Sequence, residues 1–147
     1  MPTYTVIAAA DRLSASEKQA IAQGITRAHS EATGAQGFFA QVIFQSIPAG
    51  DHFLGGAPLK SDQLFVRGEI RAGRTAEQKT ALLHALTALI AETAKTESRY
   101  VWAYLSELPP AQMVEYGKVL PQPGSEAQWL SSMSEADRDY LLGIGRA

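Results

Sequence analysis

The first two residues carry the chemical feature of the sequence that matters most. Met1 is followed by Pro2, and a small second residue, proline included, allows the initiator methionine to be removed. While Met1 is present, the Pro2 nitrogen is a tertiary amide with no N–H and no basic lone pair. Removal of Met1 creates a secondary amine that can act as a base, an acid or a nucleophile. Proline at position two is also common for reasons of translation alone, so Pro2 becomes informative only with other residues.

Two arginines lie close together in the segment Arg71-Ala72-Gly73-Arg74. Guanidinium groups bind carboxylates bidentately, and this segment directly precedes a predicted helix, whose N-terminal dipole favours anions. The segment therefore predicts a clamp for a small-molecule carboxylate substrate. A solvated basic turn is the alternative.

Three further side chains are candidates for the same site. His29 follows the apolar stripe of a predicted helix, where a core histidine is the alternative to a catalyst. Tyr104 lies in a predicted strand, where tyrosine is common for structural reasons. Glu115 lies in an apolar stretch and could act as a general base, with an exposed loop glutamate as the alternative. The chain has no cysteine, which excludes thiolate metal ligands, and we expect neither a metal nor a cofactor.

The N-terminal part of the chain predicts a strand, a helix and a second strand. Residues 3–9 are rich in β-branched side chains, which favour a strand and place the proline at its start, where a missing donor costs least. Ser14 and Glu17 have the spacing of a capping box, and Gly34 is a natural helix stop. Residues 39–44 are the second predicted strand. A helix between two strands predicts a right-handed crossover between parallel strands.

The same pattern occurs a second time. When Ser14 is placed on Thr75 without gaps, the second capping box falls on the first. The other matched positions are Lys18 with Lys79, Ile21 with Leu82, Ile25 with Leu86, Phe39 with Tyr100 and Pro48 with Pro109. The repeats cover approximately 2–48 and 63–109. We interpret them as a duplication, since a solenoid would need more copies.

The duplication predicts the fold class. Strands at 64–71 and 100–105 enclose the second helix, so two strand–helix–strand units can form one four-stranded α/β sheet with both helices on one face. The uncovered face predicts oligomerisation. We expect a single domain over 1–147, with 110–147 as a C-terminal extension.

The two copies differ at the candidate site. The mismatched pairs are Pro2 with Gln63, Arg71 with Ala10 and Arg74 with Leu13. Only the first copy can therefore carry the terminal amine, and only the second copy carries the two arginines in the turn from strand to helix.

The segments outside the repeats have weaker signals. Residues 48–62 are rich in glycine and proline and predict a loop, with a short hairpin as an option. Residues 111–124 lack helical periodicity and predict an irregular or short-strand segment. Ser134 could cap a short helix that runs through Leu142.

Composition narrows the class of partner. Among 147 residues, 13 basic side chains stand against 15 acidic ones, for a formal charge of −2, which gives no footprint for nucleic acid or an anionic membrane. No stretch approaches the length of about 18 apolar residues that predicts a membrane span, and the N-terminus lacks the regions of a signal peptide. We expect a cytoplasmic protein.

The chain resembles the tautomerase superfamily and, within it, the cis-3-chloroacrylic acid dehalogenase group. The resemblance rests on Pro2, on the duplicated unit and on residues 101–124, VWAYLSELPPAQMVEYGKVLPQPG. Shorter matches are Asp11-Arg12-Leu13, Phe44-Gln45, Pro48-Ala49-Gly50 and Phe53-Leu54-Gly55-Gly56. It implies a tautomerase-type fold, a homotrimer and no cofactor. Ile70 stands where the dehalogenase itself has a histidine, whereas other members of the group have an isoleucine there, and loop 31–39 differs in detail. The resemblance therefore does not extend to the efficiency or the substrate range.

The resemblance also implies roles for the six candidate residues. Pro2 corresponds to the catalytic amine, Arg71 and Arg74 to the substrate-binding arginines, and His29 to a histidine that helps them. Tyr104 and Glu115 correspond to the residues that activate water. The implied reaction is the hydration and dehalogenation of cis-3-chloroacrylate, which yields malonate semialdehyde.

Two alternatives are open from the sequence. In a phenylpyruvate-type keto–enol tautomerase, neutral Pro2 shuttles a proton and no water-activating base such as Glu115 is needed. In a non-catalytic trimer with a vestigial pocket, Met1 could be retained.

Overall fold

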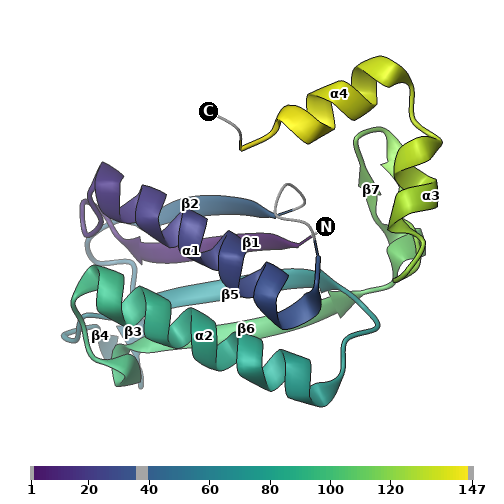
Figure 1. Ribbon diagram of the computed structural model, residues 1–147. Coiled ribbons are helices and arrows are strands. Elements are labelled where there is room, and N and C mark those ends of the chain that lie inside the picture. The colour runs from purple at the N-terminus through teal and green to yellow at the C-terminus, as the bar shows by residue number, and fades with distance from the viewer. Residues whose placement is uncertain (1, 36–39, 146–147) are drawn as a thin grey trace.

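The computed structural model describes residues 2–35 and 40–145, and two strand–helix–strand units share one sheet (Figure 1). The elements of the units are β1 (Thr3–Ala9), α1 (Ala15–Thr33), β2 (Gln41–Ile47), β5 (Leu64–Arg71), α2 (Ala76–Ala94) and β6 (Val101–Leu108). The strand order is β2-β1-β5-β6, with parallel pairs inside each unit and an antiparallel pair, β1–β5, between them. The predicted α/β fold is confirmed.

Both long helices begin with the predicted capping boxes. Ser14 accepts a hydrogen bond from the Glu17 backbone N–H, and the Glu17 carboxylate accepts one from the Ser14 N–H. Thr75 and Gln78 make the same pair of bonds at the start of α2. Gly34 ends α1 with a φ of 73°, which glycine adopts without strain. These local signals fix where each helix starts.

The two helices cover one face of the sheet, and the main core lies between them and it (Figure 1). Alternate residues of the central strands point into this core because side chains alternate along a strand. Its completely buried members are Tyr4, Ile21, Ile25, Leu64, Val66, Ile70, Leu82, Leu86 and Ile90. Ile70, the departure from the dehalogenase noted in the sequence, thus points into the core.

Gly68 in β5 makes room for the largest side chain of this core. Gly68 pairs with Tyr4 across β1 and β5, and a Cβ atom at Gly68 would lie 2.5 Å from the Tyr4 ring. Any larger residue would displace the ring, so the glycine determines where Tyr4 lies.

The opposite face of the sheet exposes large apolar side chains. Ile43 is 42% exposed, Trp102 43% and Tyr104 54%. Their register partners place all three on the face away from α1 and α2. In a single chain this face is open to water.

An ion pair stabilises the end of the sheet opposite to Arg71 and Arg74. The Arg12 guanidinium donates to both carboxylate oxygens of Asp62, at 2.6 and 2.7 Å, and to the Ala94 carbonyl at 2.6 Å. Leu13, which occupies the position of Arg74 in the repeat, is buried at 7% exposure. These contacts tie the first unit to the start of β5 and the end of α2.

The remaining segments are short elements. They are β3 (Phe53–Leu54), β4 (Ala57–Pro58), η2 (Ser98–Tyr100), η3 (Pro110–Gln112), β7 (Val114–Glu115), β8 (Lys118–Val119), α3 (Glu126–Ser131) and α4 (Glu135–Gly143). The interunit hairpin, the short strands after Pro110 and the Ser134 cap of α4 agree with the sequence. Helix α3 was not predicted. The extension has its own small core, formed by Leu120, Trp129, Met133 and Leu141.

The outer strands are longer than predicted. Strand β2 runs to Ile47 and β6 to Leu108, because each pairs with the full length of the central strand beside it. Tyr100 lies in the turn of η2 before β6, and Phe39 lies outside the described residues. Within the described residues, no helix is both long and apolar enough to cross a membrane.

Candidate functional site

Two of the candidate residues lie at one end of the sheet because β1 and β5 run in opposite directions. Pro2 precedes β1, and Arg71 is the last residue of β5, so the two lie at the same end. Pro2 is buried, and its carbonyl accepts a hydrogen bond from the Gln41 N–H at 2.9 Å. The start of the chain is thus held between strands.

Pro2 and Glu115 line one cavity of about 720 Å³. Its other lining residues are Thr3, Ala40, Gln41, Leu108, Gln112, Met113, Val114, Tyr116, Tyr140 and Ile144. The walls come from the start of β1, the end of β6 and the C-terminal extension. The fold therefore brings together residues that are far apart in the sequence.

A two-residue hairpin turn presents Glu115. Glu115 pairs with Lys118 across the turn, and the intervening Tyr116 and Gly117 have φ values of 53° and 73°. Positive φ at both positions is the geometry that closes a tight hairpin, and Gly117 is its sequence signal. Behind the turn, Trp129 donates to the Val119 carbonyl at 2.8 Å and anchors the second strand of the hairpin.

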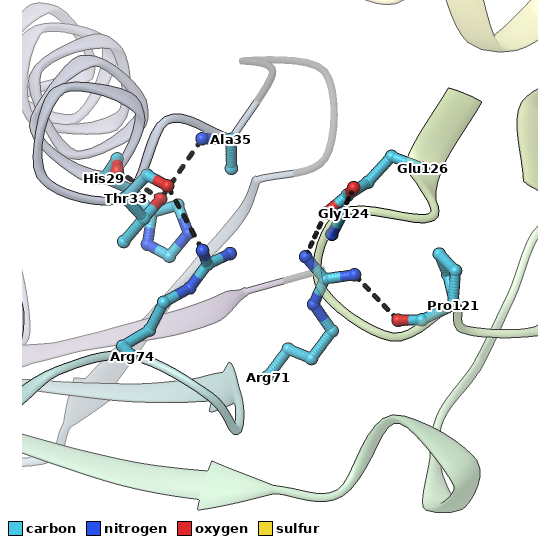
Figure 2. Close-up of polar contacts among 8 residues, drawn as sticks. All are labelled: His29, Thr33, Ala35, Arg71, Arg74, Pro121, Gly124 and Glu126. Carbon is cyan, nitrogen blue, oxygen red and sulfur yellow. Dashed lines mark hydrogen bonds and ion pairs between the residues drawn. The ribbon is translucent and has the colours of Figure 1, made fainter. Parts of the chain in front are cut away.

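Arg71 is a charged side chain with only 2% exposure. It donates to the Pro121 carbonyl at 2.7 Å and to the Glu126 carboxylate at 2.5 Å (Figure 2). Burial opposes ionisation of Glu126, but the hydrogen bond and charge of Arg71 and the backbone hydrogen bonds together outweigh it and lower the pKa of Glu126. The buried Nε of Arg71 has no hydrogen-bond partner among the described residues. Arg71 therefore keeps one donor for a further acceptor.

Arg74 meets the C-terminal end of α1. Its guanidinium donates to the Thr33 carbonyl at 3.1 Å, where the helix dipole favours a cation (Figure 2). Burial, and then the charge of Arg71, lower the pKa of Arg74. The predicted contribution of the N-terminus of α2 to anion binding stays a prediction, and Arg74 itself bonds to the end of the other helix. The two guanidinium groups point to the same side of the sheet (Figure 2).

His29 is buried at 3% exposure, and its Nδ1 lies 2.8 Å from the Tyr4 hydroxyl. Burial, followed by the charge of Arg74, lowers the pKa of His29 from 6.5 to about 4. His29 is therefore neutral at physiological pH. His29 therefore lies in the core, as one interpretation of the sequence had it, and its role in catalysis stays a prediction.

Tyr104 does not line the cavity of Pro2 and Glu115 in a single chain. Arg71, Arg74 and His29 are not among the lining residues of that cavity either. Tyr104 lies on the uncovered sheet face, its ring edge-on to Phe65 with centroids 4.8 Å apart. It lines a different hollow, beside α2. Its alternation with Ala103 along β6 would have predicted this from the sequence.

The sequence does not identify two residues of the site, Tyr4 and Glu126. Tyr4 contacts His29 across 25 residues, and Glu126 contacts Arg71 across 55. No local pattern signals either contact. Within the described residues, no cluster of three or more potential ligands could hold a metal ion.

Comparison with known proteins gives a consistent result. The family described as putative oxalocrotonate tautomerase enzyme matches residues 1–133. A crystal structure of a member of the cis-3-chloroacrylic acid dehalogenase family is similar with a TM-score of 0.92 and 33% identity, covering 97% of this chain and 99% of that one. A fused 4-OT solved as an asymmetric trimer is similar with a TM-score of 0.74 and 25% identity, covering 80% and 94%. No curated protein sequence matches.

The buried neutral histidine predicts a loss of stability in mild acid. Because the pKa of His29 is about 4 in the folded chain and 6.5 ordinarily, the unfolded chain takes up a proton first as the pH falls. This contribution to stability is complete above pH 6.5 and lost towards pH 4. Each pKa unit corresponds to about 1.4 kcal/mol, so about 3 kcal/mol is at stake. Urea unfolding at fixed protein concentration, repeated across this range, measures it.

Two variants distinguish the contribution of His29 to the pH dependence of stability from that of the other titrating groups. His29→Asn should flatten the slope between pH 6.5 and pH 4, whereas His84→Asn, at an exposed position on α2, should leave it unchanged. Equal slopes in the wild type and His29→Asn would contradict the assignment.

Proposed function

Because this chain belongs to the tautomerase superfamily and, within it, to the cis-3-chloroacrylic acid dehalogenase group, we propose that it hydrates short unsaturated carboxylic acids without a cofactor. The observation that carries the proposal is the shared cavity of Pro2 and Glu115. It offers a terminal amine, once Met1 is removed, and a carboxylate in one space. Addition of water needs both an acid and a base.

The arginines support a carboxylate as the group that is bound. Arg71 has a buried Nε without a partner among the described residues, and Arg74 points to the same side (Figure 2). His29 adds a neutral imidazole beside them. Together they would hold the substrate carboxylate and draw electron density from the conjugated double bond, which makes C3 electrophilic.

The proposed reaction adds water across the double bond of the substrate. Glu115 takes a proton from water while the oxygen bonds to C3, and the protonated amine of Pro2 gives a proton to C2. When C3 carries chlorine, the resulting halohydrin expels chloride and a proton and becomes an aldehyde. From cis-3-chloroacrylate the product is malonate semialdehyde.

We also propose that the chain works as a homotrimer. The open sheet face exposes Ile43, Trp102 and Tyr104, and a similar fused 4-OT was solved as a trimer. Tyr104 is remote from Pro2 within one chain, so it would join Glu115 only in the site of a neighbouring protomer. The cytoplasm, whose reducing conditions suit a chain without cysteine, is the proposed location.

The second candidate function is keto–enol tautomerisation of a phenylpyruvate-type acid. The family description as a putative oxalocrotonate tautomerase favours it. This reaction needs Pro2 as a neutral base and no activated water. If Met1 is retained, the Pro2 amine does not form, and the protein is expected to have neither activity. A measurement of the intact mass shows whether Met1 is present.

Glu115→Gln separates the two activities. Glutamine preserves size and hydrogen bonding but not basicity, so hydration or dehalogenation should fall by about 10²–10⁴-fold while phenylpyruvate tautomerisation changes little. Product NMR with cis-3-chloroacrylate and enol absorbance with phenylpyruvate measure them. The matched control is Glu92→Gln, an exposed glutamate of α2. Hydration at the wild-type rate in Glu115→Gln would show that water is activated elsewhere.

Arg74→Ala tests the carboxylate clamp. Loss of a hydrogen bond to a charged group costs about 1.5–3 kcal/mol, or roughly 10- to 150-fold in kcat/KM. Arg74→Lys should recover only part of the loss because lysine lacks the bidentate geometry. Steady-state kinetics on a carboxylate substrate give the values, with the exposed Arg99→Ala as control. Unchanged kinetics in Arg74→Ala would exclude the clamp.

Trp102→Glu tests the trimer. A carboxylate in the middle of the proposed interface would be buried without a partner, so the assembly should dissociate. Sedimentation equilibrium should give a mass of about three chains for the wild type and one for the variant. His84→Glu, on the helical side, should remain assembled. A monomeric wild type at micromolar concentration would reject this part of the proposal.

A further inference from the structure

Tyr4 is held in one place by its surroundings. The residue has no exposed surface, and Gly68 leaves space for its ring on the neighbouring strand. Its ring meets the His29 ring edge-on, with centroids 5.8 Å apart. The hydroxyl is thereby aimed at His29 Nδ1, 2.8 Å away.

The hydroxyl hydrogen decides the direction of this bond. Within residues 2–35 and 40–145, Nδ1 of His29 is the hydrogen-bond partner of the Tyr4 hydroxyl. If Nδ1 carried the hydrogen and donated to Tyr4, the hydroxyl hydrogen would be buried without an acceptor, at a cost of about 1–3 kcal/mol. If Tyr4 donates, both groups are satisfied. Burial also raises the pKa of Tyr4, which keeps the hydroxyl protonated.

We propose that Tyr4 is a positioning residue that donates to Nδ1 and thereby fixes His29 as the tautomer with its hydrogen on Nε2. His29 then presents a neutral N–H donor to the substrate carboxylate. The identity of that ligand rests on the proposed function, whereas the tautomer rests on the contact between Tyr4 and His29.

The neighbouring charges explain why a neutral donor suits this position. The His29 ring lies beside the guanidinium of Arg74, and Arg71 contributes a second positive charge (Figure 2). A histidine cation would add a third charge to a buried cluster, which is costly. A neutral Nε2–H adds a directional hydrogen bond to an anion without adding charge. In this tautomer the arginines attract the anionic substrate by their charge, and the neutral Nε2–H of His29 orients it by a hydrogen bond.

NMR of the full-length protein reads the tautomer directly. With ¹⁵N-labelled histidine, two-bond ¹H–¹⁵N correlations distinguish a protonated Nε2 from a protonated Nδ1. The wild type should show His29 with the hydrogen on Nε2. In Tyr4→Phe the donor is gone, so both tautomers should become populated. Tyr100→Phe, which removes one hydroxyl from a partly exposed tyrosine, should leave the wild-type pattern.

A saturated carboxylate, propanoate, probes the ligand side because it cannot be hydrated. At saturation it should shift the His29 Nε2–H signal in the wild type and shift it less in Tyr4→Phe. Loss of one neutral hydrogen bond should lower kcat/KM by roughly 2- to 10-fold in Tyr4→Phe. Normal kinetics in Tyr100→Phe complete the comparison.

The outcomes are distinct for the two proposals. Hydrogen on Nδ1 in the wild type, or an unchanged tautomer ratio in folded Tyr4→Phe, would overturn the positioning role. A wild type with hydrogen on Nε2 and a propanoate-induced shift would support it even if no unsaturated acid were hydrated, in which case only the proposed reaction would fail.

Discussion

A buried positive charge determines how this fold is completed. Arg71 ends a central strand at 2% exposure, and a guanidinium cannot be buried without acceptors. The acceptors come from the C-terminal extension, as the Pro121 carbonyl and the Glu126 carboxylate. The extension also carries the hairpin of Glu115, so satisfying Arg71 brings the wall of the cavity to the start of β1. Electrostatics at one strand end thereby links the duplicated sheet to the segment outside the repeat.

The same charge influences the residues around it. Burial is the main cause of the lowered pKa of both Arg74 and His29, and the charge of Arg71 lowers each pKa further. The site therefore collects hydrogen-bond donors with limited compensating charge, and Glu126 supplies one carboxylate. Such an environment suits an anionic ligand that accepts several hydrogen bonds. The apolar core beneath, from Tyr4 to Ile70, keeps these donors in fixed positions.

The sequence predicted the parts of the structure that depend on local signals. Both capping boxes, the glycine stop of α1 and the parallel pairing inside each unit are confirmed, since short-range chemistry specifies them. Pairing between strands set the later ends of β2 and β6, which local propensity does not encode. Tyr4 and Glu126 were missed because their bonds join distant positions. The catalytic roles of Pro2 and Glu115 stay predictions, although the two residues line one cavity.

The Arg12–Asp62 pair has a consequence for how such a chain can change over time. At that end of the sheet Leu13 lies in the core, and the Nε and Nη2 atoms of Arg12 donate to a carboxylate and a carbonyl. At the other end, Arg71 keeps a donor without a partner among the described residues. The two ends of the duplicated sheet therefore differ: one carries a closed ion pair, and the other carries a buried donor without a partner among the described residues. Substitutions around Arg71 would leave the Arg12–Asp62 contacts intact, so residues at that end of the sheet can change without loss of the contacts that stabilise the other end.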